Sequence, residues 1–360
     1  MRPIRTAAAL LAAALLPALV LPATAGAAAT LSQVHTAGRV EVSGDERRFS
    51  WPGVYFEGRF RGTGVGVVID DSAADYDVQI DGGTVATLIT PGRTTYWVRD
   101  LAAGVHRVRL VKRSESPWAV STFGGFLPAA GGAILPAPAP RHRQIEFIGD
   151  SYTAGYGNLS PTRDCTGDEV NRTTNADLSF GALVARRMRA DYQLNAFSGR
   201  GMVRNYNGGE PGTSYRTYYD RALLSVEGDV WRPAGWRPQV VVIGLGINDF
   251  STAINPGEPW TPESLAAAYR TAYQGFINKL RARYGARTMI VVSATDVGGS
   301  AVLAEAAREV VAARQDRVGY WYYGSAGLDY GGCHWHPSAH DHEVIADRLY
   351  AYLDSLRLRW

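Results

Sequence analysis

The sequence predicts an all-β jelly roll or β-sandwich over residues 30–128, followed by a three-layer α/β domain over residues 143–360. Short strand-like segments separated by turn signals fill the first region, and no helical period of useful length appears there. From residue 143 onward, apolar strands alternate with amphipathic helices, which predicts a parallel sheet covered by helices on both faces. Residues 129–142 are rich in Pro, Ala and Gly, which indicates a linker or a segment laid across the domain junction.

Residues 1–25 have the composition of a cleaved signal peptide. Arg2 and Arg5 give a positive start, residues 7–21 form an apolar stretch, and Ala23-Thr24-Ala25 is a small-residue cleavage signal. Pro17 and Pro22 interrupt the apolar run and no stop-transfer flank follows, which argues against a membrane anchor. We therefore expect a secreted protein with no membrane association after cleavage.

The charge balance gives no indication of a nucleic-acid partner. Removing Arg2 and Arg5 from the 37 basic residues leaves 35, against 34 acidic residues, so the mature chain is nearly neutral. Two cysteines, Cys165 and Cys333, remain in a chain expected to enter an oxidising compartment, where one disulfide is the default. Such a bridge would connect the two loops that carry the serine and histidine motifs described below.

The β-rich region contains short strands that recur roughly every ten residues. Asp81-Gly82-Gly83 and Pro91-Gly92 are tight-turn signals between them. Alone, this region could be a carbohydrate-binding module or a structural cap, and the residues leave both open. Examples of the predicted strands within residues 38–127 are 40–42, 49–51, 54–58, 65–69, 76–80, 85–89, 95–98 and 105–111.

The α/β region begins with a buried strand over 145–148, followed by a polar loop to about residue 175. The last helix is expected over 337–356, with Pro337 in its first turn. Five parallel strands in a doubly wound sheet make a flavodoxin-like arrangement. The remaining strands are predicted at 192–197, 240–245, 288–292 and 318–322, and the remaining helices at 178–190, 262–284 and 302–314. The helix over 262–284 has one apolar face, made by Leu265, Tyr269, Tyr273, Phe276 and Leu280.

Candidate catalytic residues follow the predicted strands directly. Ser151 follows the first strand, Gly199 the second and Asn248 the third, while His336 lies in the loop after the fifth. Because parallel α/β sheets bind ligands at the carboxyl edge of their strands, these loops are expected to meet in one crevice. A serine hydroxyl needs a base to act as a nucleophile, so Ser151 is the predicted nucleophile and His336 the base. The N–H groups of Ser151 and Gly199 and the amide of Asn248 are expected to bind the oxyanion.

Simpler interpretations exist for these residues. Ser151 alone could be an N-cap or a turn residue, and Asn248-Asp249 could be an ordinary strand-to-helix turn. The histidines at 334, 336, 340 and 342 lie within nine residues, which suggests a metal site. His340 and His342 lie two apart on a helix and cannot share a face. We therefore predict no metal site and place His342 on a helix surface or at a junction.

Four blocks of the sequence resemble those of the SGNH (GDSL-type) hydrolases. They are Gly149-Asp-Ser151, Ser198-Gly199-Arg-Gly201, Gly246-Ile-Asn248-Asp249 and His336-Pro337. Together with the β-rich leader, the arrangement is similar to carbohydrate esterase family 2. Segments 49–53, 198–206 and 333–338 look typical of that family. The resemblance implies an extracellular acetyl esterase, with a jelly roll ahead of the SGNH domain, that removes O-acetyl groups from plant polysaccharides, notably at sugar O6.

The acid of a catalytic triad is where the sequence departs from that pattern. SGNH enzymes often carry an aspartate three residues before the histidine, and Cys333 occupies that position here. Asp329 and Asp341 are close in sequence, but neither has the usual spacing. The resemblance permits a Ser–His dyad whose imidazole is held by a backbone carbonyl, and this is our leading hypothesis.

Three aromatic residues near the motifs are candidates for stacking on sugar rings: Trp335, Trp260 and Tyr206. Aromatic side chains more often belong to the core, so the alternative for each is packing. Arg200 and Arg204 could line the crevice or brace its loops through ion pairs.

The sequence thus indicates a secreted, monomeric serine esterase that needs no cofactor. It is expected to deacetylate polysaccharides such as xylan or glucomannan through an acetyl-enzyme intermediate. One alternative is an esterase acting on lipid or peptidoglycan acyl esters, although no apolar lid stretch is recognisable. Another is a catalytically inert carbohydrate-binding protein, which the presence of a nucleophile, a base and oxyanion donors disfavours.

Overall fold

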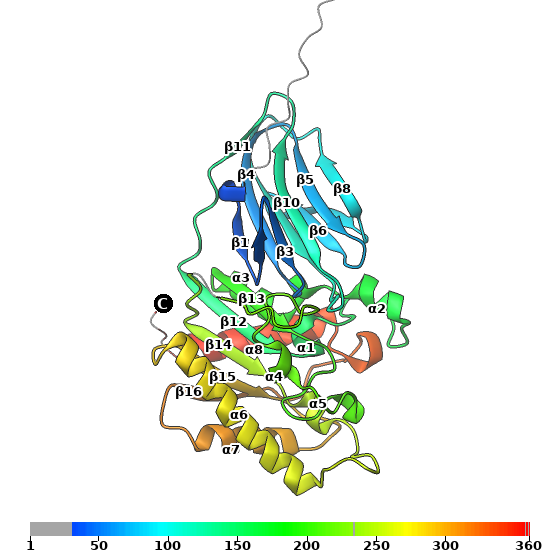
Figure 1. The fold of residues 1–360 in the computed structure, drawn as a ribbon, viewed down its shortest axis with the longest axis vertical. Helices are drawn as coiled ribbons and strands as arrows, with labels where there is room; N and C mark the ends of the chain where they lie inside the picture. Colours follow the sequence, from blue (N-terminus) through cyan, green and yellow to red (C-terminus); the bar gives the residue numbers. More distant parts are fainter. Residues whose placement is uncertain (1–30, 233–234, 357, 359) are drawn as a thin grey trace, which may run out of the picture.

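The computed structural model describes residues 31–232 and 235–356, together with residues 358 and 360. The predicted signal peptide lies outside these residues. Two units are stacked along the long axis of the molecule, a β-sandwich above and an α/β unit below (Figure 1). Both predicted fold classes are therefore confirmed.

The sandwich consists of two antiparallel sheets whose apolar inner faces form its core. Along β4, for example, Phe56, Gly58 and Phe60 are buried, while the alternate residues Glu57 and Arg59 face outward. One sheet contains β1 (His35–Ala37), β4 (Tyr55–Gly62), β9 (Gly104–Lys112), β6 (Tyr76–Ile80) and β7 (Gly83–Leu88), with β11 (Ala133–Leu135) also paired to β4. The other contains β2 (Glu41–Ser43), β3 (Glu46–Phe49), β10 (Ser121–Pro128), β5 (Val65–Asp71) and β8 (Gly92–Val98).

The sandwich differs from the prediction in four places. The expected strand over 49–51 is wrong at its end, because β3 stops at Phe49 and Trp51 is buried against the α/β unit, donating from Nε1 to the Arg221 carbonyl at 3.2 Å. Strands β1 and β10 were not predicted. Part of the expected linker forms β11, where Ala133 pairs with Arg61 of β4.

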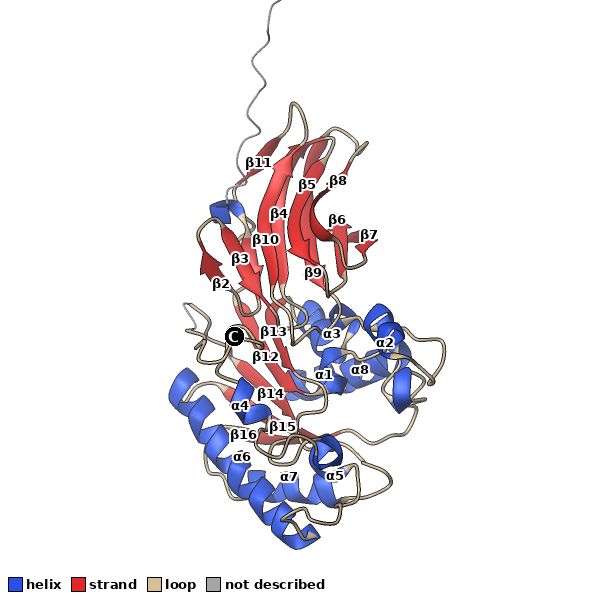
Figure 2. Ribbon diagram, turned by 45° about the vertical axis from the view of Figure 1, so that its right-hand side comes forward, coloured by secondary structure: helices blue, strands red, loops and turns tan. Residues whose placement is uncertain are grey.

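The α/β unit is built on a parallel sheet with the strand order β13-β12-β14-β15-β16. Successive residues of β14 face opposite layers: Val240 and Val242 pack with α3 and α8, whereas Val241 and Ile243 pack with α6 and α7. β13 is the edge strand next to the sandwich (Figures 1 and 2). The strands are β12 (Arg143–Gly149), β13 (Ala190–Ala196), β14 (Val240–Gly244), β15 (Met289–Ala294) and β16 (Val318–Tyr322).

Helices cover both faces of this sheet (Figure 2). The apolar face predicted for α6 is buried at all of its positions, as expected for a helix packed on a sheet. The longer helices are α3 (Phe180–Arg187), α6 (Pro262–Tyr284), α7 (Val302–Ala312) and α8 (Ala339–Ser355). Short helices are α1 (Ser151–Ala154), α2 (Gly167–Thr173), α4 (Tyr215–Tyr218) and α5 (Ile247–Phe250).

Two predictions were wrong: the start of the last helix and the absence of a helix before residue 175. Pro337 precedes the last helix, which Ser338 caps through a reciprocal capping box with Asp341. The loop expected up to residue 175 contains α2, which begins with a capping box between Thr166 and Glu169. None of the helices in the described residues is long and apolar enough to cross a membrane.

A buried ion pair connects the two units. Arg39, which follows β1, donates from Nη2 to Glu146 Oε1 of β12 at 3.2 Å, and both side chains are fully buried. The Arg39 guanidinium also lies over the rings of Trp51, Tyr219 and Trp231 at 4.4–5.1 Å from their centroids. This packing fixes the sandwich against the edge of the parallel sheet.

Candidate active site

Ser151 lies at the carboxyl end of β12, where α1 begins. The Asp150 side chain caps that helix by accepting from the Tyr152 N–H at 3.1 Å. Gly155, with φ +72°, ends it in the left-handed conformation, which glycine adopts without steric cost. The chain therefore turns sharply around a serine that is 6% exposed.

His336 contacts the Ser151 hydroxyl directly. Its Nε2 lies 2.8 Å from Ser151 Oγ, and its Nδ1 lies 2.9 Å from the Cys333 carbonyl oxygen and 3.2 Å from that of His334. Because carbonyl oxygens only accept hydrogen bonds, the Nδ1 atom must carry the proton of the neutral ring. Nε2 is then unprotonated and accepts the hydroxyl proton of Ser151, which is the arrangement a general base requires.

The surroundings of His336 keep its ring neutral. Burial lowers the pKa of His336 to about 4, against the smaller opposing effect of the two carbonyl hydrogen bonds. Tyr156 packs on the ring with centroids 4.4 Å apart, and Tyr152 contacts its edge at 5.4 Å. The imidazole is thus held in place by aromatic packing and by backbone carbonyls.

Neither nearby aspartate orients this histidine. Asp329 Oδ1 accepts from the Gly331 N–H at 2.6 Å. Asp341 accepts from the backbone N–H groups of Asp329, Tyr330 and Ser338 at 2.7–3.1 Å. Within the described residues, no carboxylate contacts either ring nitrogen of His336. The expected carbonyl contact to the imidazole is present.

The predicted disulfide is confirmed and holds the histidine loop. Cys165 and Cys333 are bonded, with their Cα atoms 5.6 Å apart. His334, next to this bridge, contacts the Tyr156 hydroxyl through Nδ1 at 3.0 Å and the Cys165 carbonyl through Nε2 at 2.9 Å. His334 and Trp335 both have a left-handed backbone, with φ of +52° and +63°, a strained conformation that the surrounding contacts must maintain.

Gly199 and Asn248 follow β13 and β14, the two strands that flank β12 in the sheet. Gly199 has φ +76°, and a Cβ at this position would meet open space. The Asn248 Nδ2 atom donates to Asp150 Oδ2 at 3.2 Å and to the Arg200 carbonyl at 3.1 Å. Burial raises the pKa of Asp150 to about 7. The amide of Asn248 therefore lies between the residue that precedes the serine and the loop that carries Gly199.

Asp249 holds the loop that carries Gly199 and continues to Arg204, which we call the glycine loop. The sequence did not reveal this role of Asp249. Its carboxylate accepts from the N–H groups of Met202, Val203 and Arg204 at 2.8–2.9 Å. Arg204 braces the same loop, donating to Glu258 at 2.6 and 2.9 Å while remaining 3% exposed. This packing favours the bracing interpretation of Arg204 over a lining role.

A second unpredicted residue comes from the sandwich. Glu115, in the loop between β9 and β10, accepts from the Ser198 N–H at 2.7 Å and from the Ser198 hydroxyl. Ser198 immediately precedes Gly199. Burial raises the pKa of Glu115, and the two donors from Ser198 oppose that rise. The sandwich therefore supplies a hydrogen-bonding anchor for the glycine loop.

The three predicted aromatic residues lie differently. Trp335 is 66% exposed beside the catalytic histidine candidate, with the Arg163 guanidinium 4.0 Å from its ring centroid. Tyr206 is 58% exposed, and its N–H donates to the Gly199 carbonyl. Trp260 is half-buried just before α6. Trp118, on the same loop as Glu115, is also exposed and was not predicted.

The histidine cluster does not converge on one point. His342 is buried at the junction of α3 and α8, where Nδ1 accepts from the Phe180 N–H at 3.1 Å, so of the two predicted positions, a helix surface or a junction, the structure shows the junction. His340 is exposed on α8. No group of three or more His, Cys, Asp or Glu side chains in the described residues is arranged to hold a metal ion.

Family models match both units of the chain. The carbohydrate esterase 2 N-terminal model matches residues 36–138, and the GDSL-like lipase/acylhydrolase model matches residues 145–349, more than half of the chain. The chain belongs to carbohydrate esterase family 2, within the GDSL-like hydrolases. This membership confirms the predicted family and the predicted class of ester hydrolase.

Relatives of this carbohydrate esterase align over nearly its whole length. An acetylxylan esterase / glucomannan deacetylase of Cellvibrio japonicus is 40% identical over 339 residues, covering 91% of this chain and 92% of the relative. A cellulase/esterase CelE of Acetivibrio thermocellus is 31% identical over 324 residues, 86% of this chain and 38% of that protein. A family two carbohydrate esterase from Clostridium thermocellum, solved in complex with cellohexaose, is 30% identical with a TM-score of 0.78, covering 90% of this chain and 98% of the other.

Proposed function

We propose that the protein is a secreted, monomeric serine esterase that removes O-acetyl groups from polysaccharides such as xylan or glucomannan. The observation that carries the proposal is the 2.8 Å contact between Ser151 Oγ and His336 Nε2, with Nδ1 of the same ring on the Cys333 carbonyl. Neither a cofactor, a nucleic acid nor a membrane has a part in this proposal.

The first half of the reaction transfers the acetyl group to the enzyme. Ser151 Oγ attacks the acetyl carbonyl carbon while His336 Nε2 takes the hydroxyl proton. The tetrahedral intermediate collapses when the bond from carbon to the sugar oxygen breaks, and the imidazolium gives its proton to that oxygen. The deacetylated sugar hydroxyl leaves, and an acetyl ester remains on Ser151.

The negative oxygen of the intermediate is stabilised by donors at three strand ends. Ser151 opens α1, so its N–H is among the helix amides that lack an intrahelical partner. Gly199 and Asn248 supply the other donors. In this structure the two N–H groups of the Asn248 amide donate to Asp150 Oδ2 and to the Arg200 carbonyl, at 3.2 and 3.1 Å, and one of them turns to the oxyanion when it forms. The second half of the reaction repeats these steps with water as the nucleophile and releases acetate.

The dyad needs no aspartate because the protein supplies the equivalent orientation by other means. Two carbonyl oxygens fix the tautomer, and Tyr156 and Tyr152 restrict rotation of the ring. The dipoles of the two backbone carbonyl groups stabilise the imidazolium that forms during each proton transfer, but more weakly than a carboxylate would. The low pKa of His336 is consistent with that weaker stabilisation.

The relatives support a polysaccharide substrate. The Cellvibrio japonicus relative is an acetylxylan esterase / glucomannan deacetylase, and the Clostridium thermocellum structure holds cellohexaose. Exposed Trp335 and Tyr206 flank the loops of the dyad and offer flat apolar faces to sugar rings. The disulfide supports export to an oxidising compartment. We propose sugar O6 as the preferred position of the acetyl group.

The test is acetate release from acetylated glucomannan, acetylated xylan and acetylated peptidoglycan, compared with long-chain aryl esters. We expect fast release from the two plant polymers, faster from O6-acetylated glucomannan, and loss of release in Ser151→Ala. Preferential hydrolysis of peptidoglycan or of long-chain esters would contradict the proposed substrate. Equal, slow release by the wild type and Ser151→Ala would contradict the proposed mechanism.

A further inference from the structure

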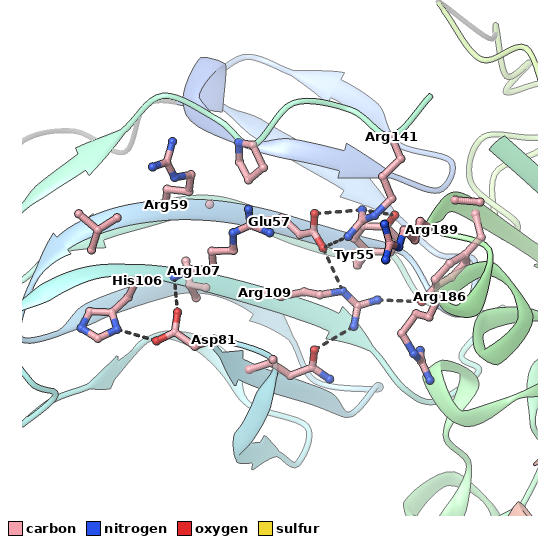
Figure 3. A pocket seen from close by; sticks show the side chains of 18 residues that line it. Tyr55, Glu57, Arg59, Asp81, His106, Arg107, Arg109, Arg141, Arg186 and Arg189 are labelled. Carbon is pink, nitrogen blue, oxygen red and sulfur yellow. Dashed lines mark hydrogen bonds and ion pairs between the residues drawn. The ribbon is translucent and has the colours of Figure 1, made fainter. Parts of the chain in front are cut away.

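A large hollow in the described part of the protein lies away from the serine. It has a volume of about 700 Å³ and runs over the outer face of β4 and β9, between the chain leading into β12 and the turn between α3 and β13 (Figure 3). It reaches Arg141, just before β12, and Ala190, the first residue of β13. Ser151 follows the other end of β12, roughly 20 Å away along a seven-residue strand. We call this hollow the arginine groove.

Arginine dominates the lining of this groove. Its two carboxylates are already engaged: Glu57 accepts from Arg141 at 2.9 and 3.1 Å, and Asp81 accepts from His106 at 2.7 Å and from the Arg107 N–H at 2.8 Å. The lining arginines are Arg59, Arg107, Arg109, Arg141, Arg186 and Arg189. The groove therefore presents an excess of positive charge, although the mature chain is nearly neutral.

Three of these arginines form no side-chain ion pair within the described part of the chain. Arg109 and Arg186 each form an ion pair with Asp177, and Arg141 forms ion pairs with Glu57 and Asp191. Among the described residues, no carboxylate lies within ion-pair distance of the guanidinium groups of Arg59, Arg107 and Arg189. Figure 3 shows these side chains around the groove, with Arg59 and Arg107 on its floor and Arg189 at the α3–β13 turn.

Placing Arg59 and Arg107 side by side does not favour the folded state by itself, because their positive charges repel each other. They are direct cross-strand partners in the antiparallel pair of β4 and β9. Like charges placed opposite each other on neighbouring strands destabilise a sheet. An anion bound between them would turn this repulsion into attraction for both guanidinium groups.

We propose that the arginine groove binds the carboxylate groups of an acidic polysaccharide, such as a glucuronate side group on a xylan chain. The planar fork of arginine matches a carboxylate through two parallel hydrogen bonds. Val105, half exposed at the edge of the groove, and Pro138 provide apolar contacts for a sugar ring. The choice of a polysaccharide over other carboxylates rests on the proposed function.

The lining disfavours nucleic acid as the ligand. Proteins that bind single strands stack bases on exposed aromatic rings. The aromatic residues of the groove, Tyr55 and Tyr192, are 1% and 2% exposed, so they offer no such surface. An acidic glycan needs only the charged groups and the small apolar edge that are present.

The experiment compares two xylooligosaccharides that differ only in one glucuronate group, using calorimetry at low salt. The wild type is measured beside Arg59→Gln/Arg107→Gln and beside a control, Arg47→Gln/Arg93→Gln, which removes the same charge from β3 and β8 of the other sheet. We expect the wild type and the control to bind the acidic sugar at least about tenfold more tightly than the neutral one, since hydrogen bonds to charged groups are strong. The groove variant should lose that preference.

Three results would overturn the proposal. In the first, the wild type binds both sugars equally. In the second, the groove variant keeps the preference for the acidic sugar. In the third, a single-stranded DNA oligonucleotide of equal charge displaces bound acidic sugar as effectively as unlabelled acidic sugar does. Hydrolysis of an aryl acetate should be the same in all variants, which verifies folding and leaves the dyad untouched. Calorimetry measures binding independently of acetate release. An error in the proposed esterase function can therefore be told apart from an absence of binding in the groove.

Discussion

Glu115 of the sandwich holds Ser198 of the hydrolase unit through both of its carboxylate oxygens. Ser198 is followed by Gly199, the predicted oxyanion donor, and Gly199 lies in the left-handed conformation that glycine tolerates best. The orientation of the Gly199 N–H thus depends on a residue from another unit of the chain. The β-sandwich therefore contributes a contact that holds a loop of the candidate active site.

Glu115→Ala should lower kcat on an aryl acetate by roughly ten- to a hundredfold, because the oxyanion donor loses its anchor. KM should change little, and Glu115→Gln should recover part of the loss, since its carbonyl oxygen can still accept from the Ser198 N–H. Glu46→Ala, which changes an exposed glutamate of the same unit, is the control. Unchanged kcat in Glu115→Ala would mean that the anchor has no catalytic consequence.

Asn248→Ala should lower kcat by about 10²–10³, the usual effect of removing one oxyanion donor. The amide lies 3.2 Å from Asp150 Oδ2 at the serine, so its loss removes a donor at the reacting centre. Steady-state kinetics on an aryl acetate gives the answer, with Asn278→Ala on the exposed side of α6 as a matched control. A decrease of less than threefold would exclude Asn248 from the oxyanion site.

The acid limb of the pH–rate profile should lie near pH 4. Only neutral His336 can take the serine proton, and burial lowers its pKa to about 4, so activity is retained down to that region and lost as the pH falls through it. Circular dichroism at each pH should accompany kcat/KM, because an unfolded chain binds protons on His336 below about pH 6.5 that the folded state excludes. A limb near pH 6.5 that persists in Asp150→Asn would contradict this assignment.

Asp329→Ala should leave kcat within about threefold of the wild type. The Asp329 carboxylate accepts from the Gly331 N–H, and His336 obtains its orientation from the Cys333 carbonyl. Kinetics on the folded variant measures the effect. A decrease of several hundredfold would refute the dyad and make Asp329 the acid of a triad.

Arg39→Met should destabilise the protein by about 3–5 kcal/mol, because it leaves the buried Glu146 carboxylate without its cation. Urea unfolding followed by tryptophan fluorescence measures the change. Arg93→Met is the control, since Arg93 is 84% exposed and its contact with Asp70 spans 3.8 Å. Such exposed pairs contribute little, and equal effects in the two variants would contradict the account of the interface.

The parallel sheet and its strand-end loops were predictable because buried strands appear in the sequence as continuous apolar runs. β14 (Val240–Gly244) is an example, and the apolar face of α6 was predictable from its helical spacing. The positions of the candidate site residues follow from the strand ends of that sheet, namely Ser151, Gly199, Asn248 and His336. β10 was missed because Gly124 and Gly125 give it the appearance of a loop. In the structure, a Cβ at Gly124 would lie 2.6 Å from Val68, so the sheet requires glycine there.

Contacts between segments distant in the sequence were beyond prediction. Glu115 lies 83 positions from Ser198, and no local pattern joins the two. For His342 the sequence left a helix surface and a junction open, and only the structure shows that α3 covers it at the junction. α2 could have been found, since Thr166 and Glu169 have the spacing of a capping box.

In the proposed mechanism, Ser151 carries the acetyl group between the two halves of the reaction. The most direct measurement is mass spectrometry of the enzyme quenched during turnover of an acetylated substrate, followed by peptide mapping. We expect one acetyl group on the peptide that contains Ser151 in the wild type, and neither this adduct nor acetate release in Ser151→Ala. Acetate release by Ser151→Ala at the wild-type rate would contradict the account.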